Sequence, residues 1–192
     1  MNIIIITGPP YSGKGTQCEF LKANYPLVHV STGELIRREK DDKTEIGRLM
    51  SAYADQGELV PDEVMKDLFG QVIDENLNQA GIILDGYPRT KPQVDTLLAL
   101  AKEKNTPITH VLNIEVPTEE LLKRAQTRAK TSKRKDDQDP KIHLKRITVF
   151  EESTKPAIEY LKEKVPVFDI DGLGTIEEIT AKISKLLQDL GS

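Results

Sequence analysis

The chain has 192 residues and a formal net charge of −4, with 38% hydrophobic and 30% charged residues. This composition excludes collagen-like and largely disordered chains, and the length fits one domain with a core of its own. No apolar run approaches the roughly 20 residues of a membrane-spanning helix and the start lacks the features of a secretory signal, so we expect a cytoplasmic protein without a membrane partner.

Short apolar stretches alternate with longer stretches of helical periodicity along most of the chain. Residues 2–7 are apolar and β-branched without alternation, which indicates a strand buried on both faces. The other expected strands are 28–30, 82–84, 108–115 and 165–170. The expected helices are 14–24, one that starts at Ser31 or Thr32, 44–55, 62–79, 94–104, 118–130, 143–164 with an interruption near Pro156, and 176–190. This alternation predicts an α/β fold with a parallel sheet, helices on both faces, and a ligand site beyond the carboxyl ends of the strands.

A glycine-rich loop follows the first expected strand and opens the first expected helix. It reads Gly8-Pro9-Pro10-Tyr11-Ser12-Gly13-Lys14-Gly15-Thr16 and matches G-x-x-x-x-G-K-[ST] with one extra glycine before the threonine. Such a loop curls its backbone N–H groups around a polyphosphate, and the helix adds its positive N-terminal end. Lys14 supplies a charge to the phosphates, and the Thr16 hydroxyl can reach Mg²⁺ or a phosphate oxygen. An ordinary glycine-rich turn rarely places lysine and threonine in this register, so the loop predicts a nucleotide phosphate site.

The segment 123–146 is strongly basic, with ten lysines and arginines against three aspartates, whereas the rest of the chain is acidic. A basic segment on an acidic body indicates a local anion site. A nucleic-acid surface would more often come with a basic pI and with aromatic side chains for stacking, and this segment contains none. We therefore expect no nucleic-acid partner.

The chain resembles the adenylate kinases, the nucleoside monophosphate kinases of the short-lid type, over nearly its full length. The resemblance rests on the loop and on three further segments: 31–37 (S-T-G-E-L-I-R), 57–62 (G-E-L-V-P-D) and 84–90 (L-D-G-Y-P-R-T), the last followed by Gln93. It implies a P-loop NTPase fold of three layers around a five-stranded parallel sheet. It further implies one nucleoside monophosphate kinase domain over 1–192, with a helical monophosphate-binding subdomain at 31–60 and a short lid at 129–139. The implied reaction is reversible, magnesium-dependent phosphoryl transfer from ATP to AMP, giving two ADP, by a monomer.

The resemblance also implies roles for individual residues. Those implied to bind ATP are Tyr11, Ser12, Gly13, Lys14, Gly15, Thr16, Arg124, Arg128 and Gly174. Those implied to bind AMP are Thr32, Arg37, Glu58, Leu59, Val60, Gly86, Tyr87, Pro88, Arg89, Gln93, Arg134 and Arg146. Those implied in catalysis are Lys14, Arg89, Arg128, Arg134 and Arg146. Thr16 and Asp85 are implied to hold Mg²⁺, largely through water.

Two positions depart from the family pattern. Tyr11 stands where the family usually has glycine, and Glu34 replaces the more usual aspartate. We expect the Tyr11 side chain to point outward and activity to be kept. Two alternatives stay open: a kinase for UMP or CMP, which Thr32 and Gln93 disfavour, and a nucleotide-binding sensor that has lost transfer because of Tyr11.

The lid is expected to close over ATP and to exclude water, and it carries no cysteine for a zinc site. The single Cys18 can form neither an internal disulfide nor a zinc site built from cysteines. Because the phosphoryl acceptor is already anionic at pH 7, the reaction needs no histidine base. We interpret His29 and His143 as ordinary packing or surface residues.

Overall fold

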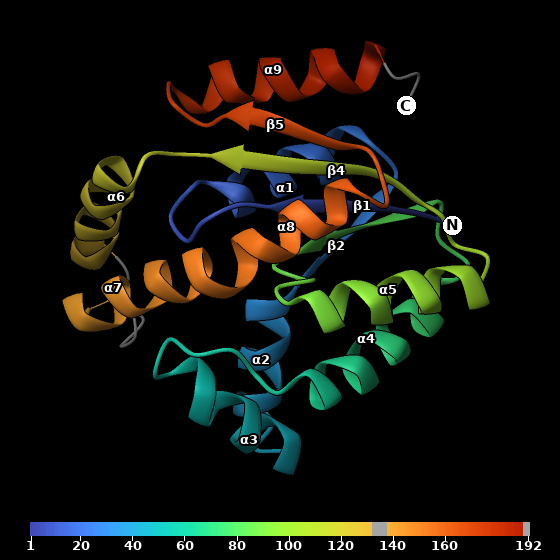
Figure 1. The fold of residues 1–192 in the computed structure, drawn as a ribbon, viewed down its shortest axis with the longest axis horizontal. Coiled ribbons are helices and arrows are strands. Elements are labelled where there is room, and N and C mark those ends of the chain that lie inside the picture. The colour runs from blue at the N-terminus through green and yellow to red at the C-terminus, as the bar shows by residue number, and fades with distance from the viewer. Residues whose placement is uncertain (132–137, 190–192) are drawn as a thin grey trace.

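The computed structural model describes residues 1–131 and 138–189, and its described strands form one parallel sheet (Figure 1). The strands are β1 (Asn2–Thr7), β2 (Leu27–Ser31), β3 (Gly81–Asp85), β4 (Ile108–Glu115) and β5 (Val167–Asp171). Their order across the sheet is β2-β3-β1-β4-β5, and every neighbouring pair is parallel. The carboxyl ends of all five strands therefore meet at one edge, where this class of fold binds its ligands. The predicted five-stranded α/β fold is confirmed.

Two hydrophobic cores lie on the two faces of this sheet, because successive side chains of a strand point to opposite faces. In β1, Ile3 and Ile5 belong to one core, and Ile4 and Ile6 belong to the other. The first core is covered by α4 (Asp62–Asn76), α5 (Lys91–Glu103) and α8 (Lys155–Lys162). The second core is covered by α1 (Lys14–Asn24), α6 (Thr118–Thr131) and α9 (Ile176–Asp189). The result is the expected arrangement of three layers.

Two further helices, α2 (Thr32–Asp41) and α3 (Glu45–Ala54), pack against each other away from the sheet (Figure 1). The close approach requires Gly47, since a Cβ there would overlap the Glu39 backbone. Thr44 caps α3 by accepting a hydrogen bond from the Gly47 N–H. These helices fall within the segment 31–60, whose identity as a monophosphate-binding subdomain stays a prediction.

The helix expected at 143–164 differs from the structure at its start and at its interruption. It begins earlier, as α7 (Pro140–Val149), because the Asp139 side chain caps it at the Lys141 N–H. The irregularity is a π-helical turn, Phe150–Thr154, which leads directly into α8. Pro156 lies in the first turn of α8, where its missing N–H and its ring are tolerated. The chain thus continues as helix through this region instead of breaking at the proline.

Most of the predicted lid, including Arg134, lies outside the described residues. None of the helices in the described ranges is both long enough and apolar enough to cross a membrane.

Candidate active site

The glycine-rich loop joins β1 to α1 at the carboxyl edge of the sheet. Two of its glycines have positive φ angles that side chains rarely adopt, 135° at Gly8 and 95° at Gly13. A Cβ at Gly8 would also overlap the carbonyl oxygen of Ile114 in β4. Gly13 and Gly15 face open space, with nothing within 4 Å of an added Cβ among the described residues. The loop therefore stays against the sheet at Gly8 and leaves room beside the start of α1.

Lys14 is folded back into this loop. Its Nζ donates to the carbonyl oxygens of Gly8 and Pro9, each at 2.8 Å, and lies 3.4 Å from Ser12 Oγ. Burial lowers the pKa of Lys14 to about 8, although the charge of Asp85 acts in the opposite direction. Loop carbonyls thus hold the ammonium group in a place where a phosphate would stabilise its charge more strongly.

A cleft of about 650 Å³ opens on the carboxyl edge of the sheet, between the loop and helices α2 and α3. It gathers many residues that lie far apart in the sequence. The predicted site residues that line it are Lys14, Thr32, Arg37, Glu58, Leu59, Val60, Gly86, Pro88, Arg89, Gln93 and Arg146. The structure therefore brings most of the predicted AMP-binding set into one cavity with the loop lysine.

Arg89 is a buried cation of this cleft. Its Nε donates to the Gly86 carbonyl oxygen at 2.6 Å, and Gly86 has a φ of 82°. Burial lowers the pKa of Arg89, Asp85 opposes that shift, and the like charge of Arg146 adds to it. Two guanidinium groups that repel each other in a partly dry cleft form a site for an anion such as phosphate.

One end of the cleft presents buried polar groups. Gln93 Oε1 accepts from the Arg89 N–H at 2.8 Å, and Gln93 Nε2 donates to Asp62 Oδ1 at 2.7 Å. Thr32 Oγ1 is buried and has no hydrogen-bond partner within the described ranges. Buried polar atoms are costly when unpaired, so the Thr32 hydroxyl is suited to a ligand contact.

Tyr87 does not join this site through its side chain. It is 1% exposed, and its ring stacks on Phe69 with centroids 3.8 Å apart. Its hydroxyl lies 3.4 Å from the Gln93 carbonyl oxygen. Tyr87 therefore packs in the core beneath Gly86 and Pro88, which do line the cleft.

A second cavity, of about 370 Å³, lies on the other side of the loop. The predicted ATP-binding residues that line it are Tyr11, Ser12, Gly13, Thr16, Arg124 and Gly174. Arg124 is fixed there by hydrogen bonds to the Gly172 carbonyl oxygen at 2.9 Å and to the Ser12 carbonyl oxygen at 3.4 Å. Gly15 and Arg128 are not among the residues that line either cavity.

Tyr11 adopts a left-handed backbone conformation, with a φ of 69°. Its hydroxyl lies 2.6 Å from His143 Nδ1 on α7, and the two ring centroids are 5.1 Å apart. The guanidinium carbon of Arg128 lies 5.9 Å from the centroid of the Tyr11 ring. The side chain thus reaches across to α6 and α7. His143 was interpreted as packing or surface, and the sequence contains no signal for this contact.

Asp85, at the end of β3, pairs with a residue that the sequence analysis left out of the site. Its Oδ2 lies 3.5 Å from His29 Nε2 on β2. Burial alone would raise the pKa of Asp85, but His29 and Lys14 outweigh it and lower that pKa. Asp85 is therefore ionised at neutral pH beside the buried His29 side chain, and it is not among the residues that line the two cavities.

The parallel sheet and the phosphate loop after β1 define a P-loop fold, and a cavity lies on either side of that loop. The family model described as adenylate kinase matches residues 6–165. An adenylate kinase of Bacteroides fragilis is 42% identical over 97% of this chain and 98% of its own length. Those of Flavobacterium psychrophilum and Porphyromonas gingivalis are 37% and 38% identical, over 97% and 96% of this chain and over 98% and 94% of their own lengths. The chain belongs to the adenylate kinase family.

Proposed function

We propose that this chain catalyses reversible, magnesium-dependent phosphoryl transfer from ATP to AMP, giving two ADP. Phosphoryl transfer between ATP and AMP is the reaction of its family. The observation that carries the assignment is the pair of cavities that share the phosphate loop: Lys14 lines the larger one, and Ser12, Gly13 and Thr16 line the smaller one. Two nucleotides laid end to end would meet at this loop.

In this proposal the larger cleft binds AMP. Its phosphate would lie against Arg37, Arg89 and Arg146, whose planar guanidinium groups suit bidentate contacts with phosphate oxygens. Its base would lie toward Thr32 and Gln93, which offer an unpaired hydroxyl and a side-chain amide. The smaller cavity would hold the adenosine part of ATP beside Arg124 and Gly174.

Catalysis would come mostly from position and charge. The transferred phosphoryl group carries its charge on three equatorial oxygens, and cations fixed in advance stabilise that charge in the transition state. Lys14 and Arg89 are fixed by hydrogen bonds to the backbone, so little reorganisation is needed when the nucleotides bind. The acceptor oxygen of AMP is anionic, so no side chain has to remove a proton. Arg128 and Arg134, from the predicted lid and the helix before it, would add further positive charge around the phosphates.

Mg²⁺ would bind between the phosphates, the Thr16 hydroxyl and, through water, the Asp85 carboxylate. The donor set fits this ion, because Mg²⁺ prefers hard oxygen ligands and keeps several waters. Thr16 is exposed at the first turn of α1, and the lowered pKa of Asp85 keeps that carboxylate charged. When bound, Mg²⁺ neutralises phosphate charge.

The test is a coupled assay with AMP, CMP, UMP, GMP and dAMP as acceptors and ATP or GTP as donor. AMP with ATP should give the highest kcat/KM, and Lys14→Met should lower it by at least about a hundredfold while the protein stays folded. Lys66→Met, which changes an exposed lysine of α4, is the matched control and should keep full activity. A preference for UMP or CMP would replace the assignment with a pyrimidine nucleotide kinase, and no transfer by folded protein would indicate a sensor. We further expect a monomer in the cytoplasm, which light scattering and cell fractionation would measure.

A further inference from the structure

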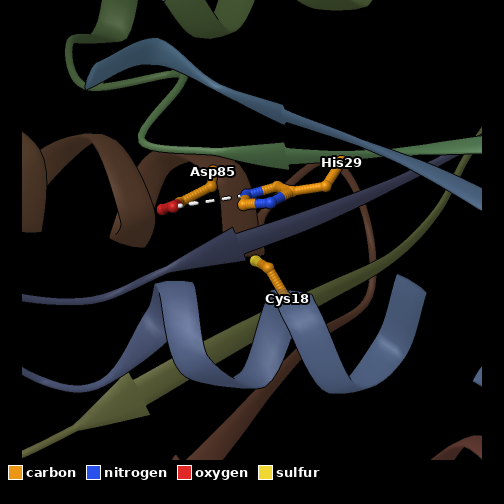
Figure 2. Close-up of side chains that lie close together, drawn as sticks. All are labelled: Cys18, His29 and Asp85. Carbon is orange, nitrogen blue, oxygen red and sulfur yellow. Dashed lines mark ion pairs between the residues drawn. The ribbon is translucent and has the colours of Figure 1, made fainter. Parts of the chain in front are cut away.

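Three side chains with metal-binding atoms converge behind the phosphate loop (Figure 2). Cys18 comes from α1, His29 from β2 and Asp85 from the end of β3. Their ligand atoms all lie within 4.8 Å of one another. Cys18 is fully buried, the His29 side chain is 5% exposed and the Asp85 side chain is 13% exposed. The cluster is therefore shielded from bulk water but reaches it at Asp85.

His29 is oriented as a metal ligand would be. Its Nδ1 lies 3.2 Å from Glu19 Oε1, and a carboxylate can only accept, so Nδ1 carries a hydrogen. Its Nε2 then points toward Asp85, with which it forms the ion pair marked in Figure 2. A carboxylate that holds the far nitrogen of an imidazole is the usual outer support of a histidine ligand.

The distance between His29 and Asp85 is also one that two ligands of a single metal ion would have. His29 Nε2 and Asp85 Oδ2 are 3.5 Å apart, whereas N–H···O bonds span about 2.7–3.2 Å. Two ligand atoms of a tetrahedral zinc ion lie roughly 3.3–3.6 Å apart, given bonds near 2.0 Å to nitrogen or oxygen and near 2.3 Å to sulfur. All three ligand atoms lie within 4.8 Å of one another, so modest side-chain movements would bring them around one ion.

We propose that Cys18, His29 and Asp85 form a binding site for Zn²⁺. One thiolate, one imidazole and one carboxylate are a donor set for zinc, and water can supply the fourth ligand. A zinc site built from cysteines alone is excluded by the single cysteine, whereas this mixed site needs only one. Burial raises the pKa of the Cys18 thiol far above its usual range, so without metal it is protonated. Zinc binding displaces that proton, and any proton on His29 Nε2, to solvent, because the ion supplies the positive charge.

Zinc in this site would inhibit phosphoryl transfer, a consequence that rests on the proposed function. A zinc ion on Asp85 would compete with the water shell of Mg²⁺ for the two oxygens of that carboxylate.

Binding is tested on the purified full chain with Co²⁺ as a coloured substitute for zinc. Because Cys18 is the single cysteine, a thiolate-to-cobalt charge-transfer band at one equivalent, removed by added Zn²⁺, would report its ligation directly. Cys18→Ala should abolish the band and His29→Gln should weaken cobalt binding at least tenfold. His110→Gln is the matched control, because it changes a histidine of β4 outside the cluster. No band with wild-type protein, or equal affinity in wild type and His29→Gln, would overturn the proposal.

Transfer activity gives an independent readout. Micromolar zinc should inhibit wild-type protein, while Cys18→Ala should keep metal-free activity and lose most of the inhibition. Inhibition of the same strength in Cys18→Ala would place the inhibitory ion elsewhere and contradict the proposal. Cobalt binding without any transfer would leave the zinc site standing and refute the proposed kinase function, so the two failures are distinguishable.

Discussion

Lys14 should take up a proton when ATP binds near pH 8. Burial lowers its pKa to about 8 in the structure, and a bound polyphosphate would favour the ammonium form and move the pKa back toward its ordinary value of 10.5. The uptake per bound ATP should then be about half a proton at pH 8, about a tenth at pH 7 and about nine tenths at pH 9. Because ATP binds the protonated form, its Kd should rise about tenfold from pH 7 to pH 9.

Isothermal titration calorimetry in buffers of different ionisation enthalpy measures this uptake. The control is Lys14→Arg, whose guanidinium stays charged across this range, so its uptake between pH 7 and pH 9 should vanish. Asp85→Asn removes the charge that raises the pKa of Lys14, so the midpoint of the uptake curve should move to lower pH. Uptake that is the same in Lys14→Arg as in wild type would refute the assignment of the proton to Lys14.

Two further sites test the geometry by substitution. Tyr11→Phe removes the hydroxyl that pairs with buried His143, so calorimetry should show a melting temperature lower by about 2–4 °C. Tyr11→Gly also relieves the positive φ and should lose less than half as much. Equal losses would show that the backbone of Tyr11 is not strained. Gly86→Ala would place a Cβ 2.7 Å from Arg89 Nη2, so steady-state kcat/KM for AMP should fall about tenfold or more. Gly70→Ala, whose added methyl meets nothing within 4 Å among the described residues, should leave it unchanged, and an unaffected Gly86→Ala would contradict the role of Arg89.

Local pattern was enough to predict the elements that build the phosphate site. The uninterrupted isoleucines of β1 predict a strand buried on both faces, and the structure has that strand. The helix α1 begins at Lys14, as expected. The strand 108–115 was likewise predicted to the residue. These features depend on residues that are close together in the sequence, so composition and periodicity are enough to predict them.

Contacts between residues that lie far apart in the sequence could not be predicted from local pattern. The Tyr11 hydroxyl meets His143 132 positions later, and only the packing of α7 against α6 brings that histidine near the loop. His29 meets Asp85 because β2 and β3 are neighbours in register, with Ser31 opposite Asp85. A histidine in a short strand gives no sign of such a partner, since strand order is a property of the whole sheet.

Tyr11 shows how the phosphate loop holds a residue other than glycine in a left-handed conformation. A left-handed φ costs a residue other than glycine roughly 1–2 kcal/mol, and a hydrogen bond returns about 1 kcal/mol. The 2.6 Å contact with His143 and the ring contacts with α6 and α7 therefore offset much of the strain. The same contact ties the loop that holds Lys14 to the helix that carries Arg146.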